Sequence, residues 1–223
     1  MTVAPENFEK LLVEVFEVGR LYDGVVFIGG IAVYLHAINH DATRAFAEAT
    51  QDADFYISLS SLSDLREIEE LSPNSRLSKH EFKRREFSFD VYAERQSRLP
   101  VPYDEVIAHA VEHEGVRVAA LEDLLVLKLE AAVDRYASEH GRKDAKDVIR
   151  ILLLAEGAGF DAHRSVAYMR ADHFERLGHI IEGPEFTSMA QGNVKLAKLM
   201  RQKATKVFQD IARAYDTNDP PSP

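Results

Sequence analysis

Hydrophobic residues recur with two different periods along the first part of the chain. Over residues 5–22 they recur at helical spacing, which predicts an amphipathic helix. The next run, GVVFIGG, is rich in β-branched residues and ends in two glycines, so we expect a buried strand that ends in a tight turn. Residues 32–38 return to a helical pattern. This order predicts a strand, a glycine turn and a helix.

A polar connection follows and leads into further β-favouring segments. DADFYISL predicts a second strand, and SLSDLREIEELS predicts a helix with Ser61 or Ser63 as its N-cap. EFKRREFSFDVYA predicts one or two more strands. In this last segment Phe87 and Phe89 alternate with polar residues such as Asp90, which is the period of a strand with two distinct faces.

The pattern changes near residue 120. LPVPYDEVIAHA is typical of a linker that enters a short helix, and HEGVRVAAL predicts a short strand. From residue 121 onward nearly all segments have helical periodicity, ending with GNVKLAKLMRQKATKVFQDIARAY. We therefore predict an α+β fold. It consists of a mixed β-sheet flanked by helices over residues 1–120, a C-terminal helical bundle over residues 121–213 and a disordered tail over residues 214–223.

Composition narrows the class of protein. The chain has 223 residues, of which 46% are hydrophobic, and this is enough to bury a core. It contains no cysteine, which excludes a disulfide framework and thiolate metal sites. The N-terminus lacks a secretory signal pattern, and no run approaches the roughly 20 apolar residues of a membrane span. We therefore expect a cytoplasmic protein that does not engage a membrane.

The formal net charge of −10 argues against indiscriminate binding of nucleic acid, which normally requires a basic surface. One segment is an exception, because residues 186–209 contain no Asp or Glu. This segment contains five basic residues: Lys195, Lys198, Arg201, Lys203 and Lys206. It is interpreted either as a solvated helix face or as a local contact for nucleic acid.

Two carboxylates stand at the start of the predicted second strand. Alternate side chains of a strand point the same way, so Asp52 and Asp54 project together, with Cα atoms roughly 6 to 7 Å apart. Carboxylates this close repel one another in a dry site unless a positive charge lies between them. Magnesium prefers such oxygen ligands and is often held by one or two carboxylates together with substrate phosphates.

Asp90 offers a third carboxylate from a neighbouring strand, on the face opposite its phenylalanines. Three carboxylates from two strands suit a two-metal centre, in which the ions clamp the attacking and leaving oxygens of a displacement. The alternative interpretation is a group of hydrated aspartates at the rim of a sheet.

Three segments in order, GGIAVYLH, TQDADFYI and FDVYA, resemble the nucleotidyltransferase fold of the DNA polymerase β superfamily in its minimal bacterial form. The resemblance implies that three carboxylates bind Mg²⁺ and act in catalysis: Asp52, Asp54 and Asp90. It also implies residues that bind the nucleoside triphosphate: Gly29, Gly30 and Thr50. A glycine turn that opens a helix offers backbone N–H groups to phosphate.

The segment ALEDLLVLKLEAAVDRYASEHGRKDAKDVIRIL is similar to the segment after the sheet in AbiEii-type nucleotidyltransferase toxins and their relatives. This resemblance gives Lys128 a catalytic role beside the triphosphate, with Asp144 and Asp147 as residues that bind the nucleotide or orient the lysine. Because Lys128 is the only charged residue in 124–129, we expect it to point out of the core toward a cavity or water. A snorkelling lysine and charge pairs within one helix are the alternatives.

The resemblance covers about residues 24–155 and implies an enzyme that moves a nucleoside monophosphate to an acceptor hydroxyl of tRNA or protein. The implied setting is a toxin–antitoxin or phage-defence system, with an antitoxin protein as a partner. Two other functions stay open. One is an inactive binding module that acts as an antitoxin or regulator. The other is a small-molecule nucleotidyltransferase of the aminoglycoside type, whose cationic acceptor an acidic chain would attract.

Overall fold

The computed structural model of the chain describes residues 5–41, 43–75, 78–157 and 159–218. The chain divides into two compact units. Unit 1 consists of Met1–His36 and Ala47–Ala120, and unit 2 of Ala37–Phe46 and Leu121–Pro223. Residues 37–46, which the sequence pattern assigned to the first domain, therefore group with the helices of the second. One reason is that Nε of Arg150 donates a hydrogen bond to the carbonyl oxygen of Phe46 at 2.6 Å.

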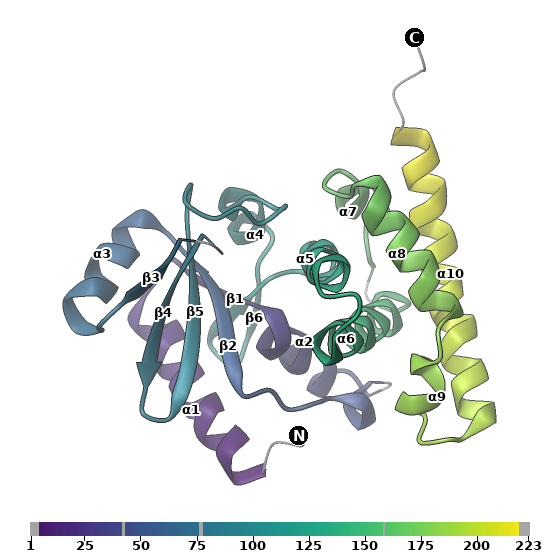
Figure 1. Cartoon of the computed structure of the whole chain (residues 1–223), viewed down its shortest axis with the longest axis horizontal. Coiled ribbons are helices and arrows are strands. Elements are labelled where there is room, and N and C mark those ends of the chain that lie inside the picture. Colours follow the sequence, from purple (N-terminus) through teal and green to yellow (C-terminus); the bar gives the residue numbers. More distant parts are fainter. Residues whose placement is uncertain (1–4, 42, 76–77, 158, 219–223) are drawn as a thin grey trace. The chain divides into compact units, whose positions relative to one another are not determined.

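Unit 1 is built on a mixed sheet that has seven strands over the described residues, in the order β3-β4-β5-β2-β1-β7-β6 (Figure 1). The strands are β1 (Val25–Ile28), β2 (Asp52–Ile57), β3 (Ser72–Asn74), β4 (Lys79–Arg84), β5 (Phe87–Ala93), β6 (Val111–His113) and β7 (Val116–Val118). Strand β5 is parallel to β2 and β7 is parallel to β1, while the other neighbours are antiparallel. The predicted α+β class with a mixed sheet is confirmed.

One face of this sheet is apolar and holds much of the core of unit 1. The rings of Phe27 and Phe55 lie 5.6 Å apart, and those of Phe82 and Phe89 stack at 4.9 Å. Helix α1 (Pro5–Leu21) packs against β1 and β7 and lies behind the strands in Figure 1. Its Gly19 permits this approach, because a Cβ atom there would lie 2.5 Å from Cγ1 of Val116. The predicted N-terminal helix is confirmed.

The helices of unit 1 begin earlier than their patterns predicted. Helix α2 (Gly29–Ile38) begins at the first glycine instead of after the second. Helix α3 (Leu59–Ile68) has Ser58 as its N-cap, so the prediction of Ser61 or Ser63 was wrong. Strand β2 ends at residue 57 and α3 begins at residue 59, so Ser58 is the residue directly before the helix. Its side chain accepts a hydrogen bond from the N–H of Ser61, one of the N–H groups that have no partner within the helix. Helix α4 (Tyr103–Ala108) follows the proline-containing linker.

Two predicted strand segments each form a hairpin. EFKRREFSFDVYA contains the end of β4 and the whole of β5, joined by a turn in which Arg85 has a φ of 54°. HEGVRVAAL contains the end of β6 and the whole of β7, and Gly115 in its turn has a φ of 84°. Such φ values are needed to reverse two strands within two residues.

Unit 2 is helical in its described residues. A short 3-10 turn, Arg44–Phe46, precedes the helices α5 (Leu121–Asp134), α6 (Glu139–Ala155), α7 (Ala162–Val166), α8 (Ala171–Glu182), α9 (Glu185–Met189) and α10 (Val194–Asn218). Helix α5 packs against α6 and α8, and α10 runs beside α8 (Figure 1). The apolar stripe of α10 is buried at Met200, Ala204, Val207 and Ile211.

Helix α10 continues to Asn218, so the tail predicted from residue 214 is helical through residue 218. The rest of that predicted tail lies outside the described residues. No helix in the described part of the chain combines the length and the apolar character needed to cross a lipid bilayer.

Candidate active site

The three predicted carboxylates share the face of the sheet opposite the phenylalanines. Asp54 of β2 is the register partner of Asp90 of β5, and Asp52 precedes Asp54 by two positions. Residues paired across two strands point to the same side of the sheet. Phe89 on β5 is fully buried, whereas Asp90 is intermediate in exposure. Strand register therefore brings Asp52, Asp54 and Asp90 onto one face.

The two glycines lie directly beside these carboxylates. Gly29 begins α2 with a φ of 68°, and a Cβ atom built on it would lie 2.2 Å from Oδ2 of Asp54. The first turn of a helix has N–H groups without partners in the helix, and these favour a negative charge. Asp54 thus lies against the N-terminal end of α2, where phosphate oxygens could also be received.

Thr50 connects the second glycine to the first aspartate. Its hydroxyl donates a hydrogen bond of 2.7 Å to Oδ1 of Asp52, and its side chain lies 3.2 Å from the position of a Cβ atom on Gly30. Thr50 is 2% exposed, so its own position is well defined by packing. It therefore orients the more exposed of the two aspartates on β2.

A lysine that the sequence analysis did not single out lies among the carboxylates. Nζ of Lys79 on β4 lies 2.5 Å from Oδ2 of Asp90 and 3.2 Å from Oε1 of Glu81. Glu81 also accepts a hydrogen bond of 2.9 Å from the amide of Asn74. The signal in the sequence was weak, because it depends on the pairing of β4 with β5, in which Glu81 is the partner of Asp90.

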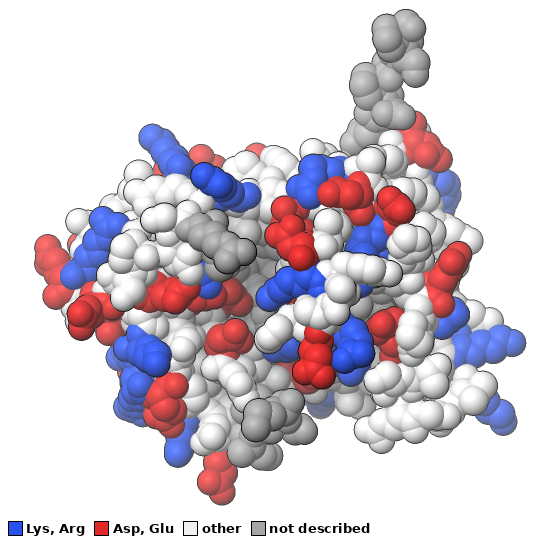
Figure 2. Space-filling model, viewed as in Figure 1, with Lys and Arg blue, Asp and Glu red and all other residues white. Residues whose placement is uncertain are grey.

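The charges on this face do not balance. Four carboxylates share it, those of Asp52, Asp54, Asp90 and Glu81, and the lysines on the same face are Lys79, which contacts Asp90 and Glu81, and the exposed Lys83. Burial raises the pKa of the Asp90 carboxyl group, and the negative charges of Glu81 and Asp52 raise it further against the opposing effect of Lys79. In Figure 2 a band of acidic side chains crosses the surface above strands β3–β5. An additional cation would relieve this excess of negative charge.

Magnesium fits the donor chemistry of this face, because carboxylate oxygens are its preferred protein ligands. Among the described residues, however, no three acidic or histidine side chains converge as a finished cation cage. The three-carboxylate, two-metal centre expected from the sequence therefore stays a prediction. Asp52 and Asp54 suit one ion whose coordination is completed by phosphates and water, while Asp90 is held by Lys79.

Unit 2 assembles the other predicted residues into an ion cluster between α5 and α6. Nζ of Lys128 lies 2.7 Å from Oδ2 of Asp147 and 3.4 Å from Oδ1 of Asp144. Nη2 of Arg135 lies 2.8 Å from Oδ2 of Asp144. Lys128 is only 7% exposed, so of the expected surroundings, a cavity or water, bulk water does not apply. Carboxylates on the neighbouring helix satisfy its charge inside the unit.

Arg150 belongs to the same cluster and forms one of the charge pairs within one helix that the sequence pattern left open. Its Nη1 donates a hydrogen bond of 2.7 Å to Oδ1 of Asp147, three residues earlier on α6. Burial alone would raise the pKa of Asp147, but the positive charges of Lys128 and Arg150 outweigh burial and hold the pKa below its ordinary value. Asp147 is therefore ionised and joins two cations.

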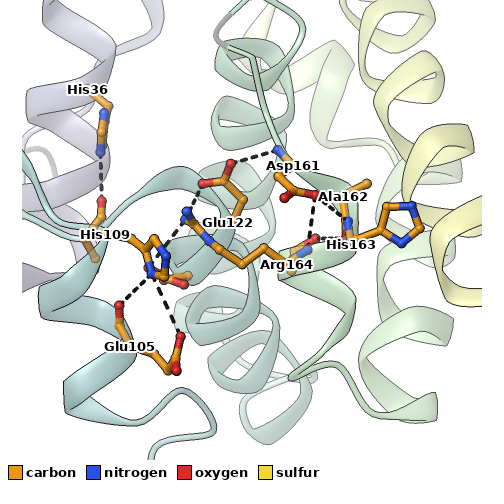
Figure 3. Close-up of polar contacts among 11 residues, drawn as sticks. His36, Glu105, His109, Glu122, Asp161, Ala162, His163 and Arg164 are labelled. Atoms are coloured by element: carbon orange, nitrogen blue, oxygen red, sulfur yellow. Dashed lines mark hydrogen bonds and ion pairs between the residues drawn. The ribbon is translucent and has the colours of Figure 1, made fainter. Parts of the chain in front are cut away.

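A second polar network joins α5 to α7. Glu122, in the first turn of α5, accepts a hydrogen bond of 2.9 Å from the backbone N–H of Asp161 and one of 2.6 Å from Nη2 of Arg164 (Figure 3). Asp161 is in turn the N-cap of α7. These contacts fasten two helices, and we assign them a structural role.

Comparison with solved structures identifies the fold. JHP933 from Helicobacter pylori has 14% identity and a TM-score of 0.50, with 97% of each chain covered. The Megavirus polyadenylate synthase has 12% identity and a TM-score of 0.50, over 79% of this chain and 40% of that one. The chain has a nucleotidyltransferase-like fold.

An antigenic nucleotidyltransferase-like protein from Paracoccidioides brasiliensis is also similar, with 12% identity and a TM-score of 0.47 over 86% of this chain and 95% of that one. No protein-family model matches the sequence, and neither does any curated protein sequence. At these identities the nucleotidyltransferase-like likeness concerns the fold, and the chemistry has to be argued from the site.

Proposed function

We propose that this chain is a magnesium-dependent nucleotidyltransferase that transfers a nucleoside monophosphate from a nucleoside triphosphate to an acceptor hydroxyl group. The observation that carries the proposal is the register of β2 and β5, which pairs Asp54 with Asp90 beside the start of α2. Oxygen ligands for a cation and N–H groups for phosphate thus occur together on a nucleotidyltransferase-like fold.

In the proposed reaction the acceptor oxygen attacks the α-phosphorus. The bond from this phosphorus to the oxygen that bridges to the β-phosphate breaks, and pyrophosphate leaves with the electron pair. Asp52 and Asp54 would hold Mg²⁺, with Thr50 orienting Asp52. When bound, magnesium neutralises phosphate charge and polarises the phosphoryl group. Asp90 would either add a ligand oxygen or accept the hydroxyl proton.

The glycine turn would contribute through its backbone. Gly29 and Gly30 form the first turn of α2, and their N–H groups would receive triphosphate oxygens. Catalysis would then come mainly from positioning and from electrostatic stabilisation of the leaving pyrophosphate. Lys128, Asp144 and Asp147 already satisfy one another's charges, which supports a role in joining α5 to α6.

The decisive experiment incubates the purified chain with each nucleoside triphosphate, labelled at the α-phosphate, and with Mg²⁺. RNA, cellular protein and aminoglycosides serve as acceptors in separate reactions. We expect transfer of label by the wild type and a loss of roughly a hundredfold or more in Asp54→Asn. Asp64→Asn is the matched control, because Asp64 is an exposed aspartate of α3 on the same unit.

Two results would count against the enzyme. One is a complete absence of magnesium-dependent transfer to every acceptor class. The other is transfer that is equal in the wild type, Asp54→Asn and Asp52→Ala, because label would then be moved by something other than this site. Treatment with ribonuclease separates an RNA acceptor such as tRNA from the others, since it abolishes only an RNA product.

The finer parts of the proposal rest on the resemblance of the sequence to AbiEii-type toxins. They are a toxin–antitoxin or phage-defence setting, a cytoplasmic location, a tRNA or protein acceptor and a cognate antitoxin protein. The exposed Lys195 and Lys198 of α10 support an RNA acceptor. Lys203 on the same helix adds less, because its Nζ is paired with Glu156 at 2.8 Å. The acidic band in Figure 2 supports a cationic small-molecule acceptor instead.

One observation favours a second candidate function, a nucleotidyltransferase-like binding module without catalysis. The ammonium of Lys79 already neutralises part of the charge on Asp90, so the carboxylates could persist without a metal ion. This module would show no binding of Mg²⁺ with nucleotide in calorimetry. The enzyme would show binding that disappears in Asp54→Asn.

A further inference from the structure

The ammonium group of Lys79 is largely shielded from solvent and contacts Asp90, one of the carboxylates proposed to bind a metal ion. The Lys79 side chain is 9% exposed and that of Asp90 is 21% exposed, and the two charged atoms lie 2.5 Å apart. A contact this short uses one oxygen of Asp90 as a hydrogen-bond acceptor. The positive charge against this oxygen opposes the approach of a second cation to it.

Register explains why the pair forms. Glu81 of β4 lies opposite Asp90 of β5, and Lys79 is two positions before Glu81 on the same strand and face. From there its side chain reaches both carboxylates, Asp90 at 2.5 Å and Glu81 at 3.2 Å. Glu81 is held by Asn74, so it offers Lys79 a second partner that is already in place.

We propose that Lys79 is a built-in counter-ion that competes with a divalent cation for Asp90. Before a cation arrives, Lys79 neutralises a partly buried carboxylate that would otherwise face Glu81 and Asp52 unpaired. A cation binds Asp90 more tightly when the ammonium moves away from it, and Glu81 is the acceptor that retains the ammonium. The inference rests on the proposed function, because it takes Asp90 as a cation ligand.

The test measures binding of Mn²⁺ alone, without nucleotide, by the electron paramagnetic resonance signal of the free ion. We expect Lys79→Gln to bind Mn²⁺ roughly tenfold more tightly than the wild type, or to bind one additional equivalent, because the competing charge is gone. Lys83→Gln is the matched control. Lys83 lies on the same strand and face, is exposed, and pairs in register with Ser88 instead of Asp90.

A double-mutant cycle with Asp90→Asn separates competition at Asp90 from a general change in charge. In the Asp90→Asn background, Lys79→Gln should change the affinity for Mn²⁺ less than twofold. This double variant also removes both members of the ion pair, so neither charge of the pair is left without its partner. Circular dichroism confirms that each variant is folded.

Three results would overturn the inference. Lys79→Gln could bind Mn²⁺ like the wild type, its gain could equal that of Lys83→Gln, or the gain could persist with Asp90→Asn. If one of these occurs while Asp54→Asn still abolishes nucleotide transfer, the inference fails and the proposed function stands. If neither the wild type nor Lys79→Gln binds Mn²⁺ alone at millimolar concentration, the inference fails, and the transfer assay with Asp54→Asn still decides the proposed function.

Discussion

The carboxylate of Asp54 fills the space that a side chain at Gly29 would need. A Cβ atom at position 29 would lie 2.2 Å from Oδ2 of Asp54, and the backbone φ of 68° is itself unfavourable for other residues. The end of β1, the start of α2 and the middle of β2 therefore meet without an intervening side chain. This contact sets how closely the carboxylates approach the N–H groups of the helix.

Gly29→Ala should accordingly lower the free energy of unfolding by about 2 kcal/mol, since left-handed backbone strain and the contact with Asp54 both oppose the folded state. It should also abolish nucleotide transfer, because Asp54 must move. Urea unfolding provides the measurement. The control is Gly178→Ala in α8, where the added Cβ would have no atom within 4 Å apart from the backbone of its own helix turn and its chain neighbours. There alanine should raise stability by up to about 1 kcal/mol.

Asp147→Asn should destabilise the chain by about 3 to 5 kcal/mol, because it leaves the buried charges of Lys128 and Arg150 without their shared partner. Asp134→Asn, which changes an exposed aspartate of α5, should stay within about 0.5 kcal/mol of the wild type. Chemical denaturation compares the two variants. Equal small effects would mean that the ion cluster contributes little to the stability of unit 2.

His36 should make the chain sensitive to moderate acid. Its Nε2 lies 2.9 Å from the carbonyl oxygen of Ala119 (Figure 3), and burial lowers its pKa from 6.5 to about 4. The unfolded chain then binds this proton more readily than the folded one, so stability is lost as the pH falls from about 6.5 to about 4. The full loss from this group is about 3 kcal/mol.

The measurement is the free energy of unfolding at several pH values in wild type and His36→Gln. The free energy of unfolding of the wild type, relative to that of His36→Gln, should decrease toward low pH, because the folded wild type would then have to bury a charged histidine. His113 contributes in the same direction, because burial also lowers its pKa and its Nε2 lies 3.2 Å from Nδ1 of His36. Parallel curves over this range would contradict the assignment.

Ser58→Ala should cost about 1 kcal/mol, since the hydroxyl of Ser58 accepts a hydrogen bond of 3.2 Å from the N–H of Ser61 at the start of α3. Ser63→Ala lies inside the helix on an exposed position and should be neutral or slightly stabilising. Thermal melts of both variants test which serine is the N-cap. The opposite order of effects would reinstate the cap predicted from the sequence pattern.

The local sequence pattern was sufficient for the strands that carry the carboxylates. Alternation with a period of two depends only on neighbouring residues, so the shared face of Asp52 and Asp54 and the polar face of Asp90 were predictable. The adjacent glycines were predictable as a turn for the same reason. The N-cap of α3 was not, because it depends on the residue at which β2 ends.

Long-range pairing decided the rest. Lys79 meets Asp90 through the register of a hairpin, and Lys128 meets Asp144 and Asp147 through the packing of α5 on α6. A lysine in a run of leucines is expected to be exposed unless a carboxylate in the interior can pair with it. For Lys128 these carboxylates come from another helix, α6, which the local sequence does not reveal. Charge compensation is a property of three-dimensional neighbours, whereas the direction of a side chain on its own strand follows from backbone geometry.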